Sequence, residues 1–397
     1  MAKTDNLSDF LTDVANSIRT KTQTSEPINA QDFSDKILSI QSGSTLKNYL
    51  DAVNGDYLFN RYDGTSVDNI IQYSDTENVT STEGMFYECK NLTSVPLLDT
   101  GNVTNMNTMF YHCDKLTTIP LLNTSNVTNM SGMFSDCKIL TSVPLLDTSN
   151  VTNMDDMFYN CWNLTAIPQF NTSNVTSMNG TFYDVAITTM PLLDTSKVTD
   201  MRRMFYRCWK LTTIPQLDTS NVVNMSSMFR QGGTISVPLL DTSKVVSMAW
   251  MFELCSDLTT IPQFNTSNVK NMSSMFDGCR NLTSIPRLDT SNVTNMEYMF
   301  GGCRKLTTIP AFDVSNVTNM DYMLRGCESL KSILMTNIGA NLDISASTLF
   351  EKADLLVILN NLKTVTSSKT LTMGADNLAK LTEAEKAIAT NKGWTLA

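Results

Sequence analysis

A unit of about 24 residues recurs along most of the chain, and this repeat limits the possible folds more than any other feature. Ten of the eleven prolines share one register, with steps of 24 residues and two steps of 23. They are Pro96, Pro120, Pro144, Pro168, Pro191, Pro215, Pro238, Pro262, Pro286 and Pro310. A unit this short cannot bury its own apolar side chains, so neighbouring units must stack and share one core.

Each unit follows the consensus L-T-x-I-P-x-L-D-T-S-N-V-T-N-M-x-x-M-F-x-x-C. The residues before the proline predict a short strand, and Asp-Thr-Ser-Asn predicts a turn. From Met154 to Cys161 the apolar residues fall at i, i+3, i+4 and i+7, which predicts a short helix with Thr152 or Asn153 as N-cap. The predicted fold class is an α/β solenoid, a leucine-rich-repeat-like right-handed coil of about eleven 23–24-residue units, each with a short parallel strand, a turn and a short helix.

The ends of the chain differ from the repeats. The predicted segments are an N-terminal helical anchor or oligomerisation segment (1–43), a linker and N-terminal cap (44–78), the solenoid (79–334) and a C-terminal α/β cap (335–397). In the C-terminal cap, Thr382 and Glu385 form a capping-box pattern that opens a helix. Gly393 is expected to end this helix before a strand at Trp394.

Two amphipathic patterns in the N-terminal segment predict a helical hairpin. Its apolar positions include Leu7, Phe10, Leu11, Val14, Ile18, Phe33 and Ile37. About forty residues cannot form a stable core alone. We therefore expect this hairpin to bind sister copies, with a trimer favoured, or another protein.

The cysteines all occupy one position of the repeat, beside the methionines and the phenylalanine. They are Cys89, Cys113, Cys137, Cys161, Cys208, Cys255, Cys279, Cys303 and Cys327. An odd number in a single column predicts small buried hydrophobic residues and argues against a disulfide framework. A redox or metal role is the less favoured alternative, because the chain lacks a C-x-x-C pair and has one histidine. We predict no metal and no cofactor.

Charge and residue content exclude several classes of function. The net charge of -10 argues against nucleic-acid binding, which needs dense Lys and Arg. His112 is the one histidine, and no column of the repeat offers an acid, a base and a nucleophile together, so we predict no enzyme. The aspartates after the prolines, such as Asp147 and Asp241, are predicted to cap turns, with calcium binding as the alternative. No apolar run is long enough for an export signal or a membrane span, which predicts synthesis in the cytosol without membrane insertion.

Aromatic residues and arginines gather at positions that the repeat leaves variable, between the methionines and after the phenylalanine or the cysteine. The predicted contact face comprises Tyr159, Trp162, Tyr183, Arg202, Arg203, Tyr206, Arg207, Trp209, Trp250, Tyr298 and Tyr322. Such residues are enriched where proteins bind partners and where sugars stack. Contact with a ligand or receptor, packing against another subunit and incidental exposure all remain open.

The repeats resemble a known class. The pattern V-T-N-M-x-x-M-F-x-x-C-x-x-L-T-x-I-P, as in Val293–Pro310, is similar to the BspA-like leucine-rich repeats of bacterial surface proteins and of phage and prophage proteins. The opening L-T-D-V-A-N-S-I-R-T-K-T and the closing L-T-E-A-E-K-A-I-A-T-N-K-G-W-T-L resemble segments of phage tail or fibre-type structural proteins.

This resemblance implies a non-enzymatic phage virion structural protein, a tail or fibre-type appendage for host attachment or particle decoration. The N-terminal helices would then bind other virion proteins, and the solenoid would contact a glycan or protein of the host surface. The alternative is a bacterial surface adhesin or protein-binding scaffold, located at the cell surface. The lack of an export signal favours the virion.

Overall fold

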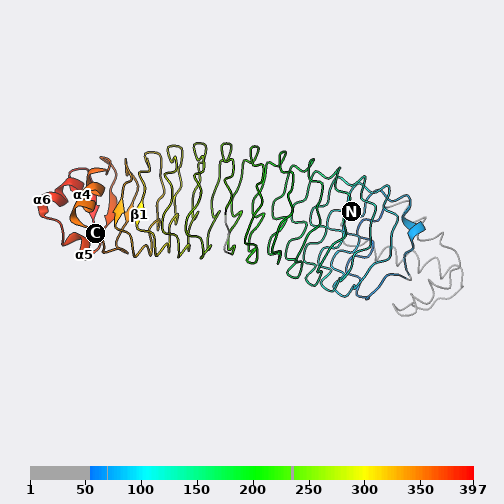
Figure 1. Cartoon of the computed structure of the whole chain (residues 1–397). Coiled ribbons are helices and arrows are strands. Elements are labelled where there is room, and N and C mark those ends of the chain that lie inside the picture. Colours follow the sequence, from blue (N-terminus) through cyan, green and yellow to red (C-terminus); the bar gives the residue numbers. More distant parts are fainter. Residues whose placement is uncertain (1–53, 69, 234–236) are drawn as a thin grey trace. The chain divides into compact units, whose positions relative to one another are not determined.

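The structure is a computed structural model that describes residues 54–68, 70–233 and 237–397. Its contacts divide the chain into two compact units, Met1–Lys197 and Val198–Ala397. Within each unit the described residues form a stack of similar coils, so the predicted repeat solenoid is confirmed (Figure 1). The handedness and the number of repeats stay predictions. The predicted helical anchor, with its apolar positions from Leu7 to Ile37, lies outside the described residues.

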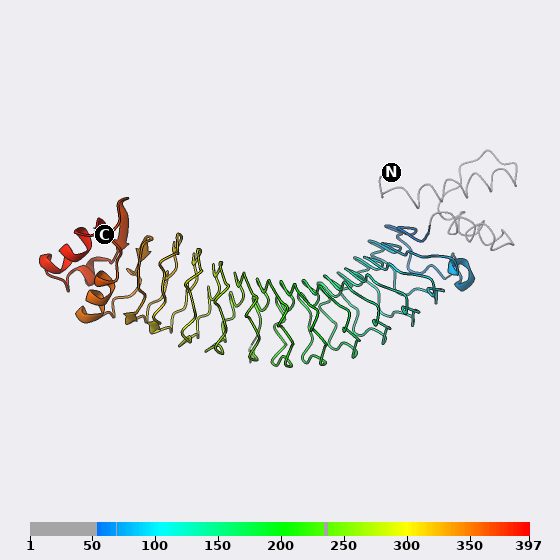
Figure 2. The ribbon, with the colours of Figure 1, turned by 90° about the horizontal axis from the view of Figure 1, so that it is seen from above.

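Each coil turns the same types of side chain inward, so the interior consists of columns that run from coil to coil. In the first unit the rings of Phe86 and Phe110 stack at 5.4 Å, and those of Phe110 and Phe134 at 5.8 Å. In the second unit Phe276 and Phe300 stack at 5.6 Å. Valine, methionine and leucine columns lie beside the rings and are equally buried. Figure 2 shows the coils of each unit lying one against the next.

The predicted short helix in each repeat is wrong. In the described residues of 79–334, the M-x-x-M-F-x-x-C segments form successive tight turns instead. The N–H of Met109 donates to the carbonyl of Met106 in its own coil (3.2 Å), whereas the N–H of Phe110 donates to Met133 of the next coil (2.9 Å). The next coil thus takes every second N–H, and a helix cannot form. Two tight turns bury the same four positions as a helix does, which explains the wrong prediction.

The residue predicted as the N-cap of this helix begins a turn instead. The side-chain oxygen Oδ1 of Asn153 accepts the N–H of Asp155 at 2.8 Å, and the same bond recurs between Asn129 and Ser131 at 3.0 Å. This Asx-turn satisfies an N–H two residues further on, which is a local alternative to helix capping. Asn153 therefore opens the run of tight turns.

Neighbouring coils pair in parallel, but mainly at the V-T-N segment and less at the predicted L-T-x-I-P segment. At the predicted L-T-x-I-P position, strands are assigned only at β1 (Thr308–Ile309) and β2 (Ser332–Ile333) within the described ranges, and these two pair in parallel. Elsewhere the recurrent parallel bridges join the V-T-N segments, as between Asn105 and Asn129. Proline has no N–H and cannot extend a ladder of hydrogen bonds. The V-T-N segments contain no proline and can therefore pair.

One residue between the two methionines of each repeat adopts left-handed backbone geometry. In the first unit φ is +57° at Gly84, +51° at Thr108 and +60° at Gly132. Glycine adopts this geometry freely, but a side chain with a Cβ is strained there, and a β-branched one most of all. The column therefore holds glycine at some coils and a strained residue at others.

Replacing Thr108 with glycine is expected to raise the free energy of unfolding by about 1 kcal/mol, because the left-handed strain is removed. Gly132→Thr should lower it by a similar amount, since its new Cβ would lie 3.0 Å from Cγ2 of Thr108. Urea unfolding of both variants beside the unaltered chain measures these changes. Stability that stays the same in both would contradict the assignment of strain.

The C-terminal residues form a smaller α/β arrangement. The strands β3 (Leu342–Asp343), β4 (Lys369–Thr372) and β5 (Trp394–Leu396) make a parallel sheet in that order, and the helices are α4 (Lys352–Asn360), α5 (Ala375–Leu378) and α6 (Glu383–Thr390). A 3-10 helix, η1 (Tyr73–Thr76), lies near the other end of the described chain. The predicted capping box is present: Glu385 N–H donates to Thr382, whose own N–H donates to the Glu385 carboxylate. No helix among the described residues could span a bilayer.

Candidate functional site

All nine cysteines are buried as free thiols. Eight of them share one hydrogen bond, in which the thiol donates to a phenylalanine carbonyl of the preceding coil; Cys137 Sγ lies 3.2 Å from Phe110 O, and Cys161 Sγ lies 3.0 Å from Phe134 O. Burial raises the pKa of the Cys89 and Cys255 thiols to about 12. A nucleophilic cysteine needs a lowered pKa and access to solvent, and this column has neither.

The histidine lies in a small ionic cluster of the first unit. Nδ1 of His112 is 3.3 Å from Asp114, and Nε2 is 3.6 Å from Asp136. Lys138 approaches Asp114 at 3.1 Å. In the described part of the chain no group of three or more His, Cys, Asp and Glu side chains is arranged to hold a metal ion.

The aspartates after the prolines close turns. Oδ1 of Asp147 accepts the N–H of Ser149 at 2.9 Å, and Oδ1 of Asp241 accepts that of Ser243 at 2.9 Å. These bonds from the serines lower the pKa of both carboxyls. Asn265 makes the same bond to Ser267, so an amide replaces the carboxylate without loss of the turn. Turn capping, the favoured reading of the sequence, accounts for this row.

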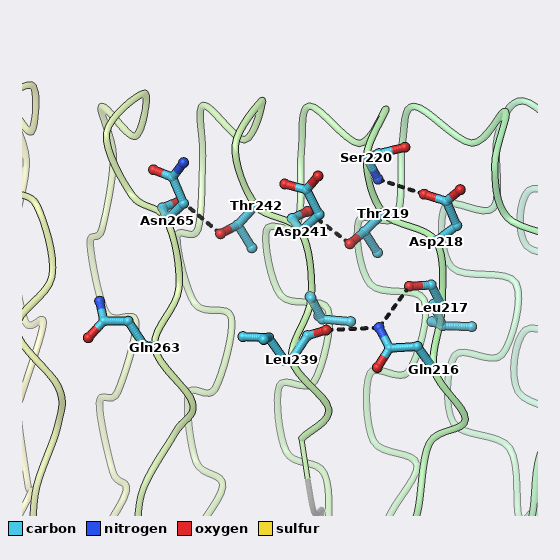
Figure 3. Close-up of a pocket in the computed structure, with 11 residues that line it drawn as sticks. Gln216, Leu217, Asp218, Thr219, Ser220, Leu239, Asp241, Thr242, Gln263 and Asn265 are labelled. Atoms are coloured by element: carbon cyan, nitrogen blue, oxygen red, sulfur yellow. Dashed lines mark hydrogen bonds between the residues drawn. The ribbon is translucent and has the colours of Figure 1, made fainter.

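A hollow in the second unit runs along this row. It has a volume of about 630 Å³, and one wall is formed by Asp218, Asp241 and Asn265. The opposite wall carries Gln216, Leu239 and Gln263, in a second row at the same height on successive coils (Figure 3). Nε2 of Gln216 donates to the carbonyl of Leu239 at 2.8 Å. The hollow is a shallow groove between two rows whose polar groups are already bonded within the protein.

The predicted contact face does not lie on helices, because the segments that carry it are tight turns. We call it the turn surface: the exposed and half-buried side chains of the M-x-x-M-F-x-x-C-x-x segments. In the first unit the rings of Tyr159 and Tyr183 stack at 4.2 Å and are half-buried. Trp162 is 48% exposed, and Nζ of Lys138 lies 5.8 Å from its ring.

In the second unit the turn surface holds the remaining predicted residues. Trp209 is 59% exposed with Nζ of Lys210 at 4.7 Å from its ring, and Trp250 is 40% exposed. Tyr298 and Tyr322 stack at 4.7 Å. Arg202 pairs with Asp200 at 2.6 Å. Arg203 and Tyr206 are half-buried, and Arg207 is exposed. The structure thus pairs Tyr159 with Tyr183 and Tyr298 with Tyr322, and it leaves the three tryptophans open to solvent.

A second exposed row was not predicted from the sequence. In the first unit a leucine outside the core follows four of the five repeat prolines, and we call these residues the leucine stripe: Leu97, Leu121, Leu145 and Leu192, which are 50%, 66%, 62% and 64% exposed. The following leucine is buried, as at Leu146, which is 2% exposed. Adjacent side chains of an extended segment point to opposite faces. The P-L-L sequences could therefore have predicted one exposed and one buried leucine.

Comparisons with known sequences place most of the chain in one family. Residues 54–143, 141–236, 186–281 and 233–337 each match the family described as Mycoplasma protein of unknown function, DUF285. No curated protein matches the chain.

Solved structures of bacterial repeat proteins are similar at low identity. A leucine rich cell surface protein from Faecalibacterium prausnitzii A2-165 is 22% identical with a TM-score of 0.44, over 66% of this chain and 78% of that one. A leucine-rich repeat protein from Eubacterium ventriosum is 16% identical with a TM-score of 0.37, over 72% and 81%. Neither is described as a phage protein.

Proposed function

The chain belongs to the family described as Mycoplasma protein of unknown function, DUF285, and we propose that it is a binding protein without enzymatic activity. Its partner is a protein or glycan of a cell surface, and the turn surface makes the contact. The observation that carries this proposal is the exposure of three tryptophans, Trp162, Trp209 and Trp250, between 40% and 59%. A coil packs without them, since other coils have lysine, serine or arginine at these positions.

Tryptophan is the residue most enriched at the centres of protein interfaces, and its ring also stacks on sugars. Neighbouring cations lie over two of the rings, at Lys138 and Lys210, which adds a polar rim to each apolar face. In the first unit the half-buried rings of Tyr159 and Tyr183 stack at 4.2 Å, and Tyr159 lies three residues before Trp162 in the same turn segment. A rigid aromatic contact of this kind loses little conformational entropy on binding.

Changing Trp162, Trp209 and Trp250 together to alanine is expected to weaken binding to intact bacterial cells at least tenfold, a loss typical of removing interface aromatics. The measurement is flow cytometry with the fluorescently labelled full chain. The matched control changes Val223 and Val246 to alanine, two exposed residues of the V-T-N position that are 44% and 38% exposed. Equal binding by the tryptophan variant and the unaltered chain would show that the turn surface is not the contact.

The location belongs to the same proposal. We propose the bacterial cell surface, which is also the location in the name of the Faecalibacterium prausnitzii protein. The virion, predicted from the two ends of the chain, depends in part on residues 1–43, which lie outside the described residues. Antibody labelling of intact cells and of purified phage particles from the same culture separates the two. Label on the particles alone would overturn the cell-surface location.

A further inference from the structure

We propose that the leucine stripe of the first unit is covered by the same stripe of a second copy of this chain, in a two-fold symmetric dimer. The proposal concerns a different face from the turn surface and does not depend on the proposed function. Leu97, Leu121 and Leu145 follow one another on consecutive coils, each at least 50% exposed. Isolated exposed leucines are ordinary, whereas a contiguous apolar row indicates an interface.

The stripe lies in a face without charge. Around it the first unit exposes threonine, serine and proline, and none of its five proline segments contains an ionisable side chain; these are residues 92–98, 116–122, 140–146, 164–170 and 187–193. The chain as a whole carries a net charge of -10, so two copies repel each other over most of their surface. An uncharged face is where two such copies can approach without that repulsion.

The regular spacing of the stripe favours a second copy as the occupant. Consecutive leucines recur once per coil, at the strand spacing of about 4.8 Å. A partner with another period would fall out of register after a few side chains, but an identical row keeps its register along the whole contact. A two-fold interface uses the same patch on both copies, so one self-complementary row is sufficient.

The first test is the concentration dependence of sedimentation of the full chain. The double variant Leu121→Gln/Leu145→Gln should raise the dissociation constant of the dimer about tenfold or more. Glutamine suits this position, because Gln169 occupies it on the next coil and donates to the carbonyl of Leu192. Thr128→Gln, at an exposed position of the V-T-N segment, is the control and should leave the constant unchanged.

The second test uses cross-linking. All nine native thiols are buried, so a cysteine introduced by Leu121→Cys is the thiol that a short bifunctional maleimide reaches. We expect a covalent dimer with Leu121→Cys and none with Thr128→Cys or the unaltered chain. A monomer at every concentration, or association that persists in the double variant with no cross-link at residue 121, would overturn the proposal.

Discussion

Replacing Phe134 with alanine is expected to lower the free energy of unfolding by about 3–5 kcal/mol, the usual cost of removing a buried phenylalanine side chain. Phe134 is fully buried, and its ring stacks on Phe110 at 5.8 Å and on Phe158 at 5.7 Å. The cavity would open between two neighbouring rings that the backbone holds at a fixed spacing. Because alternate N–H groups bind the next coil, the coils cannot move together to fill it.

Two further variants make this prediction specific. Phe134→Leu should cost much less, about 1–1.5 kcal/mol, because Leu324 occupies the same position of the repeat in the second unit. Leu145→Ala, at a 62% exposed position of the following L-T-x-V-P-L segment, should cost no more than about 0.5 kcal/mol. Urea unfolding at one low protein concentration compares all three. Equal losses for Phe134→Ala and Leu145→Ala would contradict the buried ring column.

Raising the pH from 7 to about 10 is expected to destabilise the protein by an amount on the order of 10 kcal/mol through its thiols alone. Burial raises the pKa of Cys89, Cys255 and Cys327 from 9.0 to about 12, and it also raises the pKa of Cys113, Cys137, Cys161, Cys279 and Cys303. Above pH 9 the unfolded chain releases these protons while the folded chain keeps them. Stability is therefore complete below the ordinary pKa and is lost as the pH rises towards the raised value.

Each buried thiol contributes roughly 1–2 kcal/mol to this loss at one pH unit above its ordinary pKa. The double variant Cys137→Val/Cys161→Val should therefore lose about 3 kcal/mol less between the two pH values than the unaltered chain. Valine fits the column, because the buried Val185 occupies the same position. Urea unfolding at both pH values gives the loss in the free energy of unfolding for each protein. The titration of tyrosines and lysines contributes equally to both losses, so it cancels when one is subtracted from the other. Equal losses in the two proteins would show that the thiols are not the cause.

The repeat predicted the core with little help from the structure. Its valine, methionine, phenylalanine and cysteine positions are buried columns, as the stacking of short apolar units requires. The capping box at Thr382 also followed from residue types alone, since both of its bonds are local. Features that depend on one short stretch of chain were thus accessible from the sequence.

Features that depend on the neighbouring coil were not. The segment from Met106 to Cys113 has a helical pattern of apolar residues, and nothing within it shows that Phe110 donates its N–H to Met133. The difference between Leu145 and Leu146 was accessible from strand geometry, but the aromatic residues drew attention to the turn surface instead. Which surface binds a partner cannot be derived from either row, because that depends on a molecule outside the chain.

The exchange of hydrogen bonds between equivalent positions has a consequence for how such proteins change over generations. The N–H of Thr128 binds Thr104, and that of Thr152 binds Thr128, so every coil offers its successor the same acceptors that it uses itself. Gain or loss of one complete repeat by recombination would leave all remaining bonds intact. The stack would lengthen or shorten in steps of about 4.8 Å, while a partial repeat would leave donors unpaired along a whole coil.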